Sequence, residues 1–313
     1  MRTICVLFGF LAAGAVAGEG VSITETDGKL RVEVNGALFT EYRYRDVARP
    51  YLYPIIGPQG APMTRDWPML STTNETTDHV HHKGLWFAHG DINGVNFWAE
   101  NGTYGKTVHE KTLQLTSGRK KGVVRTLNRW VAPSGETVCT DEREISFHAD
   151  TTARMIDYTV TFIASQGALK FGDTKEGTMA IRIPTTMAVT GPAGKGHIVN
   201  SEGVLDNGAW GKRAAWVDYF GPVNGKTVGI AIFDHPQNPR HPTWWHVRGY
   251  GLFAANPFGQ HNFENKPAGI GDMTLAAGGR VTFRYRFVFH AGDAKGAEIA
   301  SRYQTYRDET RHP

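Results

Sequence analysis

Short segments in which every second residue is apolar follow one another along this chain. The clearest are residues 144–148 and 281–287. A period of two is typical of an antiparallel strand with one face in the core and one face in water. The 37 glycines and 15 prolines interrupt the rest of the sequence too often for long helices. The sequence therefore predicts an all-β fold, an antiparallel β-sandwich.

The expected secondary structure is almost entirely strand. We expect strands, among other places, at residues 21–24, 30–34, 37–43, 112–116, 122–130, 137–148, 155–164, 181–190, 227–234 and 280–290. One segment, residues 295–306, reads as helical. No internal repeat of about 20 to 50 residues is visible, which argues against a propeller or a solenoid.

The N-terminus has the pattern of a secretory signal peptide. Arg2 supplies the positive charge, residues 4–13 the apolar region, and residues 15–17 the small-residue cleavage site. We therefore expect residues 1–17 to be removed, and the protein to be periplasmic or secreted. Residues 18–313 contain no linker rich in Pro, Ser or Gly, so a single β-sandwich domain is predicted.

Composition excludes some partners. No later segment approaches the roughly 20 apolar residues of a membrane-spanning helix, so no membrane insertion is expected. The net charge of +4 is spread thinly, without a cluster of Lys and Arg among aromatics, and nucleic acid is not an expected partner. Removal of the signal peptide with Cys5 would leave Cys139 alone, which rules out an internal disulfide. The sequence does not identify a cofactor.

Four of the 13 histidines lie close together, at His79, His81, His82 and His89. Imidazole titrates near neutral pH and transfers protons, so such a cluster indicates chemistry, with His82 and His89 as candidate acids or bases. The alternative is that some are core or edge-strand histidines bonded to the backbone. A second alternative is a metal site, because His79 and His81 would share one face of a strand, with Asp78 and His89 completing the ligands.

Polar and aromatic side chains surround this cluster. A sugar has apolar C–H faces that stack on rings and hydroxyls that pair with amides and charged groups. This mixture predicts a carbohydrate site, and its candidate binding residues here are His81, Lys83, Trp86 and Asn96. The alternative is that the aromatic residues simply belong to the core.

A glycine-bounded turn, residues 171–177, carries two further candidates. Glu176 is a candidate general base, and Lys175 a candidate electrophile for an oxyanion. If the turn is extended, these neighbours point to different sides, and at most one of them faces a substrate. The alternative is an ordinary solvated turn.

The third candidate region is residues 243–259. If residues 244–250 form a strand, Trp244, His246 and Arg248 share a face that is too polar for a core. We expect His246 to be an acid or base and Arg248 to bind substrate, unless Arg248 merely pairs with an acidic neighbour. Asn256 and His261 follow in a turn that would close the cleft.

Several short motifs resemble an exported bacterial family often labelled "methane oxygenase PmoA". They are RPYLYPIIGP at 49–58, TRDWP at 64–68, HHKGLWF at 81–87, GVNFW at 94–98, TKEG at 174–177 and NPF at 256–258. The true PmoA protein is a membrane subunit with several spans, and this chain has no spanning segment. The resemblance implies membership of that family but not oxygenase activity.

A weaker resemblance is to the galactose-mutarotase-like sandwich. Residues 50–57 are similar to its early strand of the form P-x-L-F-P-x-x-G, and residues 275–289 to its last turn and long strand. The resemblance implies a catalytic His acid and Glu base, with His246 in the place of the acid. The Glu position falls near Asn256, which has no carboxylate, and this leaves Glu176 or Glu264 as substitutes.

Together these observations predict a carbohydrate-active protein, a hydrolase, lyase or epimerase with His/Glu acid-base chemistry on a sugar. The prediction requires His82, Glu176 and His246 to converge on one concave face of a sheet. A non-catalytic carbohydrate-binding module and a metal-dependent oxidoreductase centred on the histidine cluster are the rival hypotheses.

Overall fold

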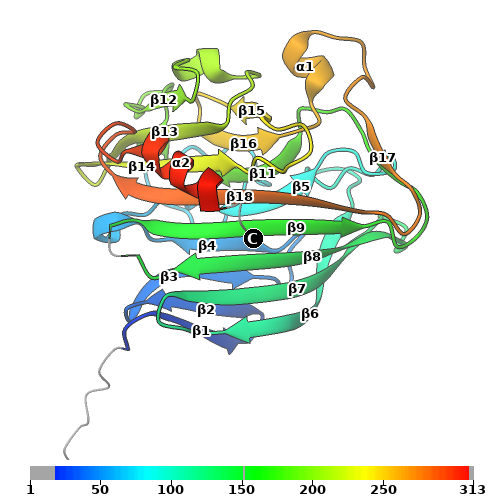
Figure 1. The fold of residues 1–313 in the computed structure, drawn as a ribbon, viewed down its shortest axis with the longest axis horizontal. Helices are drawn as coiled ribbons and strands as arrows, with labels where there is room; N and C mark the ends of the chain where they lie inside the picture. The colour runs from blue at the N-terminus through cyan, green and yellow to red at the C-terminus, as the bar shows by residue number, and fades with distance from the viewer. Residues whose placement is uncertain (1–17, 151, 310–313) are drawn as a thin grey trace, which may run out of the picture.

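The structure, a computed structural model, describes residues 18–150 and 152–309. Two eight-stranded antiparallel sheets pack face to face, with a two-stranded sheet at one side (Figure 1). Strands hold 46% of the residues and helices 9%. The prediction of an all-β antiparallel sandwich is confirmed. The predicted signal peptide, residues 1–17, lies outside the described residues.

The first sheet carries the candidate site and is called the site sheet here. Its strands, in spatial order, are β1 (Val21–Thr26), β2 (Lys29–Val34), β3 (Ala37–Arg43), β4 (Tyr51–Ile55), β5 (Leu85–His89), β11 (Gly177–Arg182), β16 (Leu252–Asn256) and β15 (Trp244–Val247).

The second sheet is built mostly from long strands in which apolar and polar residues alternate. Its order is β12 (His197–Asn200), β13 (Trp216–Val223), β14 (Lys226–Asp234), β18 (Arg280–Ala291), β9 (Arg154–Ile163), β8 (Thr137–His148), β7 (Lys121–Val131) and β6 (Lys106–Thr116). The short strands β10 (Leu169–Phe171) and β17 (Met273–Leu275) pair with each other.

Helices are few. The helical segments are α1 (Gln260–Glu264), α2 (Ile299–Glu309) and the 3-10 turns η1 (Pro58–Gly60), η2 (Thr185–Met187) and η3 (Asp206–Ala209). Helix α2 lies over the outer face of the second sheet, where Tyr303 and Tyr306 pack on Phe233 (Figure 1). No helix within residues 18–150 and 152–309 is long and apolar enough to cross a membrane.

The main core lies between the inner faces of the two sheets. Trp130, Phe162 and Phe171 are buried there, with centroids of neighbouring rings about 5 Å apart. A smaller apolar cluster lies on the outer face of the site sheet and includes Trp86 and Trp98. The central strands of the site sheet are therefore buried on both faces.

Two sequence predictions about elements are wrong at their ends. The strand expected at 181–190 stops at Arg182, because Pro184 cannot donate a ladder hydrogen bond and the chain turns into η2. The helix expected at 295–306 begins only at Ile299, since Glu298 has a positive φ of 55° that no right-handed helix accommodates.

Candidate functional site

A pocket opens on the outer face of the site sheet. The strand registers place Trp86, Ala180, Ala254 and His246 side by side across β5, β11, β16 and β15, so all four side chains point to the same face. A hollow of about 280 Å³ opens on this face beside His246. Ala180 and Ala254 are fully buried beneath this face and do not line the hollow.

Segments far apart in the sequence line this pocket. The lining residues are His79, His81, His82, Asn96, Trp98, Ala99, Lys175, Glu176, His246, Arg248, Tyr250 and Leu252. The structure therefore brings His82, Glu176 and His246 together around one cavity. It also brings Lys175 and Glu176 there together. The expectation that at most one of them faces the cavity is wrong, because the turn is not extended and the Lys175 ammonium folds back onto the Glu176 carboxylate.

His246 is held in one orientation. Its ring is 3% exposed, and Nδ1 lies 2.5 Å from the backbone oxygen of Lys175. A carbonyl only accepts hydrogen bonds, so Nδ1 carries the proton and Nε2 keeps its lone pair. Burial lowers the pKa of His246 to about 4, against the opposing effects of the Lys175 carbonyl and the nearby Glu176 charge. The ring is therefore neutral at pH 7.

Hydrogen bonds from neighbouring segments hold the backbone of the turn that carries Lys175 and Glu176. Fully buried Asn256 donates from Nδ2 to the carbonyl oxygens of Thr174 and Lys175, each at 2.9 Å. The backbone N–H of Lys175 donates to Oδ1 of Asn262 at 2.9 Å, and the backbone N–H of Gly90 donates to the backbone carbonyl oxygen of Glu176 at 2.7 Å. The backbone of this turn is thus preorganised, while the Glu176 side chain stays 35% exposed at the pocket.

Stacked rings form the opposite wall. His82 lies between Trp86 and His79, with centroid distances of 5.3 and 4.6 Å, and His79 stacks in turn on Tyr250 at 5.3 Å. Nδ1 of His82 accepts a hydrogen bond from Arg182 at 3.3 Å. Burial is the largest cause that lowers the pKa of His82, and the neighbouring His81 and Arg182 lower it further. His82 is consequently neutral and able to donate only through Nε2.

The Asp78 carboxylate binds the two arginines that lie next to these stacked rings. Asp78 accepts hydrogen bonds from the buried side chains of Arg65 and Arg182 and lies 2.8 Å from Nδ1 of His79. Partial burial raises the pKa of Asp78, but the His79 contact and the two guanidinium charges outweigh this and hold it below its usual value. His81 forms no ion pair with a carboxylate of the described residues, and burial together with the Arg49 charge lowers its pKa to about 4.

His89 does not reach the pocket, although it was expected among the catalytic residues. It is paired with Gly177 in the ladder, on the same side of the sheet as Phe87, and therefore points into the main core. Its Nε2 is 2.9 Å from the Gly172 oxygen, and its ring packs on Phe258 at 4.6 Å. The other residues of this strand are all apolar, so no alternation marks the face of His89, and its placement was not readable in the sequence.

Some expected binding residues support the pocket without lining it. Trp86 lies beneath His82, and Asn256 anchors the Lys175 turn, as described above. Lys83 is bound to Glu100 instead. His261 belongs to α1, and its Nδ1 lies 3.0 Å from Oδ1 of Asp173. Glu264, considered as a substitute carboxylate, accepts hydrogen bonds from Trp244 and Gln260 and does not line the cavity.

The four residues of the alternative metal site do not assemble. His89 points to the other face of the sheet from His79 and His81, and Asp78 is engaged by two arginines. Within the described ranges, no group of three or more His, Cys, Asp or Glu side chains is arranged to hold a metal ion. The pocket is lined by imidazoles and charged side chains.

Two important residues of the pocket were hard to find from the sequence. Arg182 ends an otherwise apolar strand and binds both His82 and Asp78, and its only signal was a charge at the end of a buried run. Tyr250 stacks on His79 and lines the pocket from the turn after β15. A ring contact between distant loops leaves no sequence pattern.

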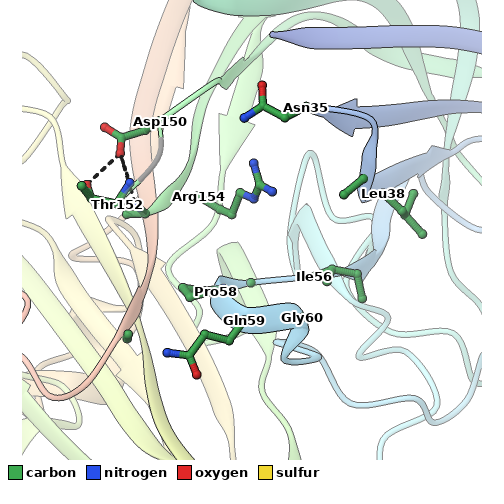
Figure 2. A pocket seen from close by; sticks show the side chains of 13 residues that line it. Asn35, Leu38, Ile56, Pro58, Gln59, Gly60, Asp150, Thr152 and Arg154 are labelled. Atoms are coloured by element: carbon green, nitrogen blue, oxygen red, sulfur yellow. Dashed lines mark hydrogen bonds between the residues drawn. The ribbon is translucent and has the colours of Figure 1, made fainter. Parts of the chain in front are cut away.

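A larger hollow lies near η1 and the loop before β9, with a volume of about 460 Å³. Figure 2 shows its side chains, among them Asn35, Gln59 and Arg154. Its carboxylate, Asp150, is bonded to Thr152 within its own loop, at 2.6 Å from the backbone N–H and 2.7 Å from the hydroxyl. This hollow holds no histidine and no acid-base pair, so the pocket on the site sheet is the better candidate.

Comparison with known proteins identifies the family. The chain belongs to a family of unknown function (DUF6807), whose model matches residues 29–304. A search of curated proteins gives no match.

Three solved structures with mutarotase-related descriptions match at low similarity. A galactose mutarotase-like protein from Lactobacillus casei ATCC 334 is 11% identical, with 87% of this chain and 100% of that chain covered and a TM-score of 0.34. A putative aldose 1-epimerase from Escherichia coli K12 is 12% identical, with 88% and 100% covered and a TM-score of 0.30. A galactose mutarotase related enzyme from Lactobacillus acidophilus is 8% identical, with 87% and 97% covered and a TM-score of 0.29.

Proposed function

We propose that this member of DUF6807 is an exported carbohydrate-active enzyme, a hydrolase, lyase or epimerase that acts on a sugar in the site-sheet pocket. The observation that carries the proposal is the fixed His246 ring beside Glu176. With Nδ1–H committed to the Lys175 carbonyl, Nε2 offers a lone pair to whatever occupies the cavity. The oxygenase label of the similar exported family is not part of the proposal.

The acid-base pair is His246 and Glu176. A neutral imidazole with a free Nε2 accepts a proton from a bound sugar and returns it in a later step. Glu176 lines the same cavity and its charge acts on the His246 ring, so the two groups are close enough to share one substrate. In this proposal His246 starts as the base, which differs from the acid role implied by the mutarotase resemblance.

The other lining residues suit a sugar. Trp98 and Tyr250 offer aromatic surface for C–H faces, while Asn96 and Lys175 offer polar groups for hydroxyls. The volume of about 280 Å³ is close to the lower end of typical ligand pockets, about 300–1,000 Å³. The pocket therefore suits a small polar ring better than a large apolar ligand.

The test is a screen of residues 18–313 against glycosides and oligosaccharides, with mass spectrometry of the products. We expect turnover of at least one sugar, and a loss on the order of 10²-fold or more in His246→Ala and Glu176→Gln. The control is His197→Ala, because the His197 side chain is 63% exposed and lies outside the pocket. Sugar binding without turnover would instead support the non-catalytic binding module and overturn the enzyme proposal.

Export is the second part of the proposal and has its own measurement. Expression of the full chain in a Gram-negative host, followed by N-terminal sequencing of the periplasmic protein, should give a chain that begins near Gly18. Retention of the full-length chain in the cytoplasm would contradict export and leave the pocket chemistry untouched.

A further inference from the structure

Arg248 is the one pocket cation among the described residues without an anionic partner. Its guanidinium carbon lies 5.4 Å from the ring centre of Trp210 and 5.7 Å from that of Tyr250. No ion pair or side-chain hydrogen bond of Arg248 occurs within the described ranges, so the expected alternative of an acidic neighbour does not hold. The two rings hold the guanidinium in place while its N–H groups remain uncommitted.

The other cations around the pocket already have carboxylate partners. Arg65 and Arg182 share Asp78, and Lys175 contacts Glu176. On the far side of the histidine wall, Glu100 binds both Arg49 and Lys83. Asp78 and Glu100 are thus each shared by two cations, and Arg248 adds a further unpaired charge. Arg248 therefore differs from these cations in having no carboxylate partner within the described residues.

Arg248 also marks a boundary between two hollows. A second cavity of about 340 Å³ is lined by Trp210, Asn207 and Thr190 and shares Arg248 and Tyr250 with the first. A ligand bound in the first pocket therefore reaches the guanidinium at the edge that opens toward the second. A planar guanidinium with free donors matches the paired oxygens of a carboxylate, sulfate or phosphate.

We propose that the substrate of this pocket is an anionic sugar, whose carboxylate, sulfate or phosphate group pairs with Arg248. This inference rests on the proposed function and adds the chemical class of its substrate. It accounts for an arginine that is held by two aromatic rings and lacks a partner within the described protein.

The test is calorimetric titration of residues 18–313 at pH 7 and low salt. The probes are D-galacturonate and D-glucuronate, galactose 6-sulfate and glucose 6-phosphate, each with its neutral parent sugar. We expect at least one anionic probe to bind on the order of ten-fold or more tightly than its parent, and to lose this advantage in Arg248→Gln. The probe that binds identifies which oxyanion is recognised.

Three measurements make the result specific. Arg119→Gln removes the same charge at a side chain that is 86% exposed and should leave binding unchanged. Arg248→Lys keeps the charge without the planar fork and should retain only part of the preference, with melting temperatures checked for both variants. Raising the salt to about 0.5 M should weaken the anionic probe more than its parent.

The outcomes separate this inference from the proposed function. Equal binding of anionic and neutral sugars, or an unchanged preference in Arg248→Gln, overturns the anionic substrate while His246-dependent turnover still stands. Failure of every sugar, neutral or anionic, to bind or turn over overturns both.

Discussion

A histidine that donates from one ring nitrogen to the backbone has a single nitrogen left for chemistry. His246 is in this state, since Nδ1 faces the Lys175 carbonyl, whereas His89 has its Nε2 on the Gly172 carbonyl in the core. Both residues are buried, but only His246 lines the pocket. At the residue scale, orientation and not burial separates a candidate catalytic histidine from a structural one.

The ionisation of His246 is measurable without a substrate. Burial sets its pKa at about 4, and the Arg248 charge contributes to lowering it while the Glu176 charge raises it. The ring is therefore neutral above about pH 4. In an NMR titration of the imidazole, Arg248→Gln should move the His246 pKa upward and Glu176→Gln should move it downward. A wild-type pKa near 6.5 would contradict the buried, backbone-bonded ring.

His89 and His246 should respond oppositely to removal. His89→Ala leaves a core cavity and an unsatisfied Gly172 carbonyl, so we expect the free energy of unfolding to fall by about 2 kcal/mol or more in urea titrations. His246→Ala should cost less, because the Lys175 carbonyl keeps its hydrogen bond from Asn256. Equal losses of stability in the two variants would remove the distinction between them.

The same urea titrations have a predicted pH dependence. The pKa of His89 is about 4 in the folded protein, below its ordinary value of 6.5, because burial disfavours the charged ring. The unfolded chain therefore binds the proton first. The stability from this neutral ring is complete above pH 6.5 and is lost as the pH falls toward 4. His89→Ala should flatten this part of the stability profile, whereas His197→Ala, at an exposed position, should not.

At the scale of elements, the turn between β10 and β11 depends on a residue from another strand. Asn256 of β16 gives both protons of its amide to carbonyls of this turn and accepts the Phe258 N–H at 2.9 Å. The carboxylate of Glu176 is thus positioned by a side chain that never touches the cavity. The conformation of the turn therefore depends on β16.

This dependence predicts an ordered pair of variants. Asn256→Ala leaves buried carbonyls with fewer donors, and we expect a loss of about 1–3 kcal/mol in the free energy of unfolding. Asn256→Asp keeps the acceptor for Phe258 but sets a carboxylate against two carbonyl oxygens, and should lose more. Urea denaturation measures both, and an aspartate variant more stable than the alanine variant would show that the turn is held otherwise.

The sequence predicted the long strands β6 to β9, β14 and β18 of the second sheet, but not its strands β12 and β13, and not β5 and β16 at the site. Strand β8 matches its expected range because one face is buried and the other is wet. All residues of β5 and β16 are buried, since loops and rings cover the outer face of the site sheet. Such strands have no polar face, so their positions leave no alternating signal.

The candidate site was predictable in part for a related reason. Glu176 and His246 lie in polar segments that a core would exclude, and the structure places both at the pocket. The stacking of Arg248 between Trp210 and Tyr250 depends on loop geometry and was not readable. The pattern of polar and apolar residues indicates which face of a strand is buried. Contacts between loops that are far apart in the sequence follow only from the three-dimensional fold.

At the scale of the whole molecule, one continuous core joins the two sheets. It runs from Val21 in β1 to Phe289 in β18 and includes Cys139, which is fully buried. Burial raises the pKa of the Cys139 thiol far above its usual value, so the reactive thiolate is suppressed in the folded protein. We therefore expect residues 18–313 to unfold as one unit.

The buried thiol makes this cooperative unfolding measurable. In residues 18–313, a thiol reagent should label Cys139 only when the chain unfolds, and the denaturant midpoint from labelling should coincide with the midpoint from circular dichroism. Cys139→Ala should show the same circular dichroism transition shape, with no labelling. Labelling at a lower denaturant concentration than the loss of β signal would indicate separate folding units.

The order of strands in the site sheet also determines at what stage of folding the pocket can assemble. Strand β5 pairs with β11 only after the chain has passed through β6 to β9 of the other sheet, and β11 then pairs with β16. Pairings of such long range form late and slowly. During synthesis, a growing chain that has not yet reached residue 252 lacks β16, so β15 has no strand to pair with. Truncation before that residue should therefore abolish the proposed activity while leaving the early hairpins able to form.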